Sequence, residues 1–483
     1  MQLSIYKSTD FNIILVGIFI SILLSNSGCK KYVQVPPPST QLVTASVFDN
    51  AASATAAQTV IYTQMEDQSY IMAQSTGLLS DELNNNSTNS GNIQFYRNAM
   101  TAATGPGPWS SAYNYIYQAN AIISALQNNN NIVASIRNQL TGESLFIRAF
   151  WHFYLTNLYG DIPLVTTTNY VINSSISRTS QALVYQQIIS DLQTAQDLLS
   201  QNYVDETDTT ATTQRVRPTK WAAMALLARV YLYTGQYANA ETQATSVINS
   251  GLYNLANLQN DGVFKANSSE AIWQLAIPLP ASNTATPDGT YFILISAPGT
   301  GINNSNTLST NLLSSFEPGD ARRTNWIDSI KVGSLVYYFP YKYKVQNSSA
   351  ATPSEYVMVL RLAEQYLIRA EAEARLGDMI NAANDLNTIR SRANLGPSPT
   401  LTASSSLQQA DSAILHERQV ELFTEWGNRW LDLTRTANIN GVMGGNNGVC
   451  AAKGGSWAST DSLYPIPQSE ITLDANLTQN PGY

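Results

Sequence analysis

The same helix–turn–helix pattern occurs twice in this chain, 142 residues apart, and it limits the fold more than any other feature. An apolar segment over 221–233 has helical spacing, breaks at Gly235 and resumes as a second helical segment over 238–248. Residues 370–382 repeat the middle of this pattern, with Gly377 in the position of Gly235. Apolar residues at helical spacing on both sides of a glycine turn predict two antiparallel helices that pack on each other. The chain therefore builds its core from helix pairs.

Small residues occupy matching positions in the two copies: Ala228 with Ala370, and Ala240 with Ala382. They allow antiparallel helices to approach closely, as in the tetratricopeptide unit that this pattern resembles. Helical periodicity predicts further helices over 112–126, 142–159 and 183–199. We expect a mainly α fold, a tetratricopeptide-like helix-pair bundle (an α–α superhelix) with long loop insertions and small β insertions.

Three long insertions separate the helical segments, near residues 80–110, 255–355 and 437–462. The second insertion contains short apolar stretches at 272–277, 291–294 and 335–339, divided by loops rich in Gly, Asn, Ser and Pro, which predict small strands. Long loops on a rigid scaffold are the usual location of recognition sites. We therefore expect any ligand to bind at these insertions.

The charge of the chain excludes two classes of function. Only 12% of the 483 residues are charged and the formal net charge is −8, so the chain lacks the basic surface that nucleic acid requires. Two histidines and two cysteines are too few for a zinc site of the usual kind. No metal and no cofactor is expected.

The N-terminus carries the pattern of a secreted, lipid-anchored protein. Residues 11–24 form a nearly unbroken apolar block. The block is shorter than the roughly 20 residues that a transmembrane helix needs, but it has the right length for the apolar region of a signal peptide. Small residues lead directly to Cys29, as in a bacterial lipobox, so we expect residues 1–28 to be removed and Cys29 to be acylated. Acyl chains on Cys29 would hold the protein on a membrane without spanning it. Residues 29–45 then form the lipid anchor and linker, and 46–483 a single domain.

Several motifs in a fixed order resemble one protein family. They are Gly142 to Ala149, Tyr159 to Leu164, the segment His416 to Arg435 (HERQVELFTEWGNRWLDLTR), Leu463 to Ile471 and the ending Asn480-Pro481-Gly482-Tyr483. Together with Cys29-Lys30-Lys31-Tyr32 at the start, they resemble the SusD/RagB family over nearly the whole mature chain.

The resemblance implies an outer-membrane lipoprotein that faces the cell exterior and caps a SusC-like TonB-dependent transporter. Family members capture oligosaccharides, or in some cases peptides, and pass them to that barrel. The resemblance also implies a helical core of tetratricopeptide-like pairs packed toward the transporter, with ligand held by variable loops. No nucleic acid partner is expected.

No residue pattern indicates an enzyme. Glu417, Glu421 and Glu425 recur every four residues, a spacing that puts carboxylates on one helix face, where a pair of them could act as acid and base. Arginines, however, interleave with these glutamates. Such a ladder is more often structural, with Glu425 and Arg429 as an ordinary i,i+4 ion pair. Neither His152 nor His416 accompanies a nucleophile motif. We expect binding without catalysis.

Neutral sugars bind to aromatic faces flanked by amide, carboxylate and guanidinium groups, so aromatic residues outside the helical periodicity are candidates. The candidate ligand-binding residues are Asn85, Tyr96, Tyr291, Phe292, Trp326 and Trp457. The alternative for each aromatic is packing under its own loop. Asp320 and Arg322, close to Trp326, belong to an element that resembles a recurring family element, so their charges are candidates for a structural role.

The leading hypothesis is a surface lipoprotein that binds oligosaccharides and passes them to a SusC-like transporter. The alternatives are a family member that captures peptides, an adaptor that clamps the transporter and has no ligand of its own, and a hydrolase. The sequence does not identify the glycan or peptide.

Overall fold

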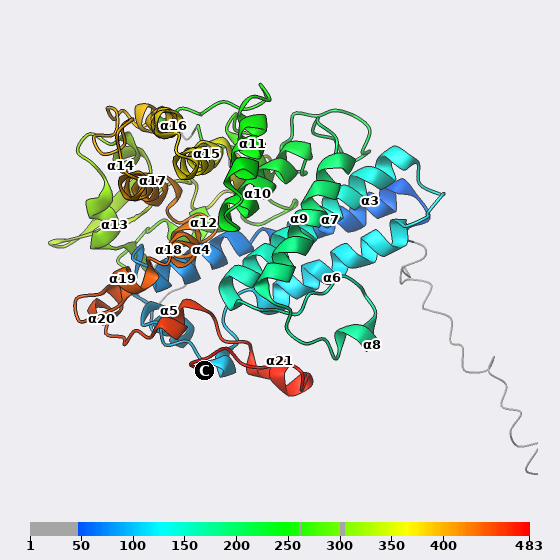
Figure 1. Ribbon diagram of the computed structural model, residues 1–483, viewed down its shortest axis with the longest axis horizontal. Helices are drawn as coiled ribbons and strands as arrows, with labels where there is room; N and C mark the ends of the chain where they lie inside the picture. The colour runs from blue at the N-terminus through cyan, green and yellow to red at the C-terminus, as the bar shows by residue number, and fades with distance from the viewer. Residues whose placement is uncertain (1–46, 260–261, 300–304) are drawn as a thin grey trace, which may run out of the picture. The chain divides into compact units, whose positions relative to one another are not determined.

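Antiparallel helices form the core of the computed structural model, which describes all residues except 1–46, 260–261 and 300–304 (Figure 1). The expected signal peptide (1–28) and the anchor and linker (29–45, with Cys29) lie outside the described residues. Residues Phe48–Tyr483 form one unit. Its longer helices are α3 (Ala51–Met65), α4 (Gln68–Leu79), α6 (Trp109–Leu126), α7 (Ala134–Tyr159), α9 (Gln181–Leu198), α10 (Lys220–Tyr233), α11 (Tyr237–Ile248), α15 (Leu362–Leu376), α16 (Met379–Arg392), α17 (Leu407–Leu422) and α18 (Asn428–Arg435).

The two predicted helix pairs are confirmed. Helix α10 packs on α11, and α15 packs on α16, while α15 also contacts α11 (Figure 1). Gly235 and Gly377 close the two turns with φ of 71° and 90°, a backbone conformation in which glycine has no steric cost. The four matched alanines are buried at 0% exposure, so the helices approach closely where the sequence placed small residues. The predicted helices over 112–126, 142–159 and 183–199 appear as α6, α7 and α9, which pack side by side.

Short helices and strands occupy the insertions. The short helices are α5 (Ser90–Tyr96), α8 (Tyr170–Asn173), α12 (Pro287–Phe292), α13 (Thr310–Ser315), α14 (Ala321–Asn325), α19 (Ile439–Met443), α20 (Val449–Ala452) and α21 (Gln468–Leu473), with 3₁₀ turns at Ala102–Thr104 and Ser459–Ser462. The strands of the described residues are β1 (Leu83–Asn85), β2 (Ala271–Leu275), β3 (Asn306–Leu308), β4 (Ile327–Val332), β5 (Leu335–Pro340) and β6 (Val357–Arg361).

Those strands pair antiparallel in three two-stranded sheets, β1 with β3, β2 with β6 and β4 with β5. The stretches 272–277 and 335–339 therefore contain strands, as expected. The stretch 291–294 does not, because Tyr291 and Phe292 end helix α12. The Thr286 side chain accepts a hydrogen bond from the Gly289 N–H and Pro287 occupies the first turn, and both features favour a helix start over a strand.

The segment 416–435 is also not one continuous helix. Helix α17 begins at a capping box formed by Ser406 and Gln409 and ends at Leu422. Thr424, Trp426 and Gly427 then take positive φ values of 52°, 49° and 77°, and α18 begins at Asn428. Glu425 therefore lies in the turn and not on the same helix face as Glu417 and Glu421.

The three glutamates join a buried ionic network. Arg322 donates to Glu417 at 2.6 Å and to Glu421 at 2.9 Å. Arg361 donates to Glu421 at 2.6 Å and to Glu425 at 2.7 Å. Burial alone would raise the pKa of Glu421, but the neighbouring arginines hold it well below its usual range. The three carboxylates are paired with basic side chains and enclosed, which is the structural role that the interleaved arginines predicted.

The predicted Glu425–Arg429 pair is wrong. Glu425 pairs with Arg361 and Lys342, whereas the Arg429 guanidinium pairs with Asp81 at 2.7 Å. The turn after Leu422 separates the two side chains, so the i,i+4 spacing of a continuous helix does not apply.

Candidate functional site

Aromatic side chains from α4 and α12 pack together near the β1–β3 sheet. Tyr291 stacks on Tyr70 with ring centroids 4.6 Å apart and an interplanar angle of 31°. Phe292 meets the same Tyr70 ring edge-on at 5.0 Å. Tyr70 and Phe292 are buried, whereas Tyr291 is half-buried. Tyr291 therefore presents part of its ring to solvent from a rigid aromatic base.

Amide side chains continue from these rings to the sheet. Gln74 Nε2 donates to the Tyr70 hydroxyl oxygen at 2.6 Å and to Asn306 Oδ1 at 2.7 Å. Asn306 lies opposite Asn85 in the β1–β3 ladder. The half-buried Asn85 side chain is held by two hydrogen bonds of 3.0 Å, one to the Ser87 carbonyl and one from the Ser87 N–H. Fixed aromatic and amide groups thus lie close together. We call Asn85, Tyr96 and Tyr291, together with the residues that hold them (Tyr70, Gln74, Asn306 and Lys453), the loop surface.

Two buried carboxyl groups flank the loop surface without forming an ion pair among the described residues. Asp288 lies one turn before Tyr291 in α12 and accepts a hydrogen bond from Ser69 at 3.3 Å. Glu82 directly precedes β1. Burial raises the pKa of Asp288 to about 7 and the pKa of Glu82 to about 8. Both groups are therefore largely neutral in mildly acidic solution.

Tyr96 ends helix α5, which follows β1 in the chain and contacts it. It is half-buried, and the Lys453 ammonium lies 5.1 Å from its ring centroid. The same ammonium donates to the Leu78 carbonyl at 2.7 Å and to the Ser80 carbonyl, at the C-terminus of α4. Lys453 therefore joins the third insertion to the helix that carries Tyr70.

Of the remaining candidates, Trp326 and Phe292 are buried and Trp457 packs against another tryptophan. Trp326 and Phe292 are 2% and 3% exposed, so neither ring offers a face to a ligand. Trp326 instead lies under the Lys342 ammonium at 4.7 Å, beside the ionic network. Trp457 is half-buried, stands 6.2 Å from the Trp430 ring and donates from Nε1 to Asn440 at 2.9 Å. The structure thus brings Tyr291 and Phe292 together against Tyr70 and connects Asn85 to them through Asn306 and Gln74. Trp326 lies in the interior of the same hydrophobic cluster.

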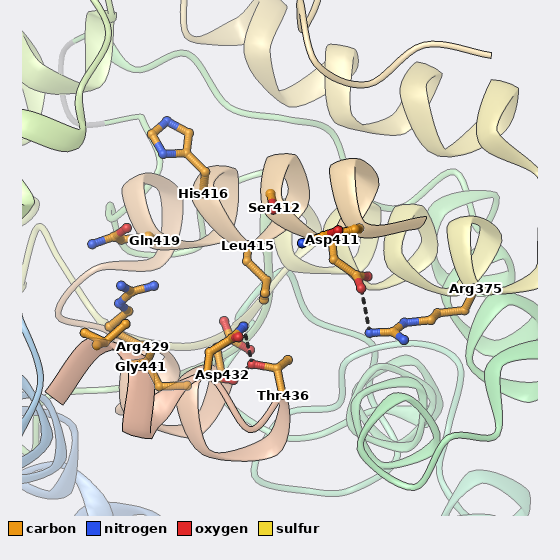
Figure 2. Close-up of a pocket in the computed structure, with 14 residues that line it drawn as sticks. Arg375, Asp411, Ser412, Leu415, His416, Gln419, Arg429, Asp432, Thr436 and Gly441 are labelled. Atoms are coloured by element: carbon orange, nitrogen blue, oxygen red, sulfur yellow. Dashed lines mark hydrogen bonds and ion pairs between the residues drawn. The ribbon is translucent and has the colours of Figure 1, made fainter. Parts of the chain in front are cut away.

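A second feature is a polar cavity of about 550 Å³ beside α17, α18 and α19 (Figure 2). Arg375 and Asp411 point toward each other across one end and form an ion pair of 3.0 Å. Gln419 and Arg429 line the other end, where Arg429 is already paired with Asp81. The described residues that line the cavity include no Phe, Tyr or Trp, the rings on which a sugar usually stacks.

The two carboxyl groups of this cavity pair with arginines and have opposite pKa shifts, since burial raises the pKa of Asp411, which pairs with Arg375. Burial would raise the pKa of Asp432, but Arg418 and Arg435 hold it below its usual range. His416 borders the cavity, and burial lowers its pKa. The other histidine, His152, is fully buried in α7, where burial lowers its pKa to about 3 and leaves it neutral.

Tyr70, Gln74, Asn306 and Lys453 complete the loop surface but were not candidates from the sequence. Tyr70 and Gln74 lie one turn apart on α4. Any two residues on one face of a helix have this spacing, so the spacing does not mark them as a binding site. Asn306 joins them only because β3 pairs with β1 across more than two hundred residues of chain. The Asn-rich composition of the first insertion was the one signal that pointed to this neighbourhood.

The profile of the SusD family matches residues 70–483, which is most of the chain. The chain belongs to the SusD family. Among relatives of this SusD-family protein, SusD-like protein P2 of Formosa agariphila is 28% identical over 421 residues, covering 78% of this chain and 80% of the relative. Starch-binding protein SusD of Bacteroides thetaiotaomicron is 36% identical over 141 residues, covering 28% of this chain and 23% of the relative.

Solved structures share the fold. A SusD superfamily protein of Bacteroides vulgatus aligns with a TM-score of 0.76 at 20% identity, over 90% of this chain and 100% of the other. A laminarin-binding SusD-like protein aligns with a TM-score of 0.71 at 23% identity, over 89% and 99% of the two chains. These likenesses confirm the mainly helical fold expected for this SusD-family protein. None of the described helices is long and apolar enough to cross a membrane.

Proposed function

We propose that this SusD-family protein binds oligosaccharides at the loop surface, through Tyr291, Tyr96 and Asn85, without altering them. The observation that carries the proposal is the half-buried Tyr291 ring stacked at 4.6 Å on Tyr70, next to fixed amides. An aromatic ring held on one face and open on another suits the apolar face of a sugar, and amides suit its hydroxyl groups. Phe292 packs edge-on against the Tyr70 ring that carries Tyr291. Trp457 packs against Trp430 and stabilises the third insertion.

The names of relatives agree with a glycan ligand. One relative is a starch-binding protein and one structural neighbour binds laminarin. Both ligands are neutral glucose polymers, which match a surface whose acidic neighbours, Asp288 and Glu82, are buried and largely neutral in mildly acidic solution. A charged ligand would gain nothing from such groups.

The proposal extends to anchoring and delivery. Acylation of Cys29 would hold the protein on the outer membrane, facing the exterior, and a SusC-like TonB-dependent transporter would receive the glycan. A modest affinity suits this role, because the ligand must leave again. The family alternatives, peptide capture or an adaptor without ligand, differ in what the loop surface binds.

The test is calorimetric titration of the full chain carrying Cys29→Ser with laminarin oligosaccharides, malto-oligosaccharides and a peptide mixture. We expect binding to at least one glycan, and at least a tenfold loss of affinity in Tyr291→Ala. Tyr117→Ala is the matched control, because Tyr117 is 52% exposed on α6 and lies outside the loop surface. Saturable peptide binding without glycan binding would establish the first alternative, and no binding at all would favour the adaptor.

A further inference from the structure

Two of the three most exposed apolar side chains of the described residues, Leu473 and Tyr170, line one groove, and the third, Val171, follows Tyr170 on α8. Leu473 is 81% exposed, Tyr170 is 79% exposed and Val171 is 77% exposed, and the next large apolar residue is at 65%. Tyr170 and Val171 belong to α8, and Leu473 ends α21. Exposed apolar residues scattered singly need no explanation, but a concentration of them marks an interaction surface.

The groove between α8 and α21 has a volume of about 300 Å³ and a firm base. Trp109 and Tyr113 line it with ring centroids 4.9 Å apart, and the Tyr113 hydroxyl donates to the Pro163 carbonyl at 2.9 Å. Tyr170 and Leu473 form its exposed edges.

Hydrogen bonds hold the two sides of the groove in place. Asn476 Nδ2 donates to the Ser175 carbonyl at 3.0 Å, which ties the C-terminal segment to the end of α8. Arg178 donates to the Thr478 carbonyl at 3.0 Å and to Asn480 at 2.5 Å. A surface fixed in this way loses little conformational entropy when a partner binds.

The polar groups of the groove accept hydrogen bonds and carry negative charge. Glu470 and Asp474 line it, and no lysine or arginine does. The buried Asn173 Oδ1 also borders the groove and has no hydrogen-bond partner among the described residues. A complementary occupant is therefore apolar in the middle and donates hydrogen bonds or positive charge at its edges.

This chemistry selects among occupants. A symmetric contact between two copies would bring Glu470 and Asp474 of both chains together, and like charges oppose such a contact. An anionic membrane surface is disfavoured for the same reason.

We infer that the groove between α8 and α21 docks an apolar segment of another protein, flanked by lysine or arginine. Within the proposed function, on which this identification of the partner rests, that protein is the transporter. The loop surface then binds the ligand and the groove binds the partner.

Photo-crosslinking in the native envelope tests the inference, with p-benzoylphenylalanine placed at Val171 or Leu473 of the full chain. We expect an adduct with an outer-membrane barrel, mapped by mass spectrometry to an apolar segment beside a lysine or arginine. Placement at Leu335, which is 58% exposed in β5, is the control and should give no such adduct. Adducts only with a second copy, or with lipid, would overturn the inference.

Variants provide the second arm. The triple change Tyr170→Ser, Val171→Ser and Leu473→Ser should reduce co-purification of the barrel at least tenfold, and Glu470→Lys with Asp474→Lys should do the same. The control triple, Val332→Ser, Leu335→Ser and Val336→Ser, should leave co-purification unchanged. Glycan titration separates the two proposals. If the groove variants co-purify with the barrel as well as wild type does and still bind glycan, the docking role of the groove is refuted and the proposed function is not. If the protein forms the crosslinks but binds no glycan, the ligand proposed for the loop surface is refuted and the docking role of the groove is not.

Discussion

Buried carboxyl groups behave in opposite ways in two regions of this molecule. In the ionic network around α17, Glu421 faces three arginines and Glu425 faces Arg361 and Lys342, and these partners hold the pKa of each glutamate below its usual range despite burial. Beside the loop surface, burial raises the pKa of Asp288 to about 7 and that of Glu82 to about 8, and neither forms an ion pair among the described residues. Burial is similar in the two regions, so the presence of an arginine partner decides the charge.

This difference in charge distinguishes the ionic network, which stabilises the fold, from the loop surface, which we propose binds the ligand. A network of ionised pairs tolerates no missing member, because removing one partner leaves an uncompensated buried charge. Neutral groups near the loop surface create little field, which suits a ligand without charge. The chain therefore concentrates its few charged residues where they fix the turn between α17 and α18, and leaves the loop surface to amides and rings.

The largest expected effect comes from breaking the network. Arg361→Met removes the donor to Glu421 and Glu425 and should lower the free energy of unfolding by about 3–5 kcal/mol, measured by chemical denaturation. The matched control is Arg375→Met, since the Arg375–Asp411 pair is partly exposed, with side chains 27% and 24% accessible. It should cost no more than about 1 kcal/mol. Equal losses in both variants would contradict the distinction between the regions.

The next prediction uses pH. Between about pH 4 and pH 7, Asp288 is protonated in the folded state and ionised in the unfolded state, so its contribution to stability falls as pH rises. Asp288→Asn should remove this slope, which amounts to about 1.4 kcal/mol per pH unit. Glu421→Gln tests the opposite sign, because its lowered pKa means that wild-type stability is lost on acidification. Thermal unfolding from about pH 2 to pH 8 measures both, because the contribution of Glu421 changes only below its unfolded pKa near 4.5. A curve for Asp288→Asn parallel to wild type would refute the first prediction.

The third prediction concerns the neutral hydrogen bonds of the loop surface. Gln74→Met keeps the volume of the side chain but removes the amide that bonds Tyr70 and Asn306. Stability should fall by about 1 kcal/mol per lost bond, and glycan affinity by a factor of about three to ten, because the base under Tyr291 is less well oriented. Denaturation and calorimetric titration measure the two effects. Unchanged affinity would separate Gln74 from the loop surface.

Sequence patterns predicted the helices better than the binding surface, for a physical reason. The Gly235 and Gly377 turns and their alanines are local features, so periodicity was enough to find α10, α11, α15 and α16. The pairing of Asn85 with Asn306, and of Tyr291 with Tyr70, depends on contacts between distant segments. Trp326 was a wrong candidate for the same reason. It lies in a polar stretch of sequence, but in the fold its ring packs against the Lys342 and Arg392 side chains. The break after Leu422 was likewise hidden, because Thr424 and Trp426 adopt positive φ without any glycine at those positions.

The smallest expected effect concerns Trp457 in the third insertion, and it tests whether this residue supports the fold or contacts the ligand. Trp457 packs against Trp430 and bonds Asn440, so we interpret it as support for the insertion and not as a ligand contact. Trp457→Phe keeps a ring on Trp430 but removes the N–H donor, and it should cost about 0.5–1.5 kcal/mol of stability while glycan affinity stays within a factor of two. Trp457→Ala should cost more stability and still leave affinity nearly unchanged, provided Lys453 keeps its place over Tyr96. A tenfold loss of affinity in Trp457→Ala, with stability close to that of Trp457→Phe, would instead make Trp457 part of the loop surface.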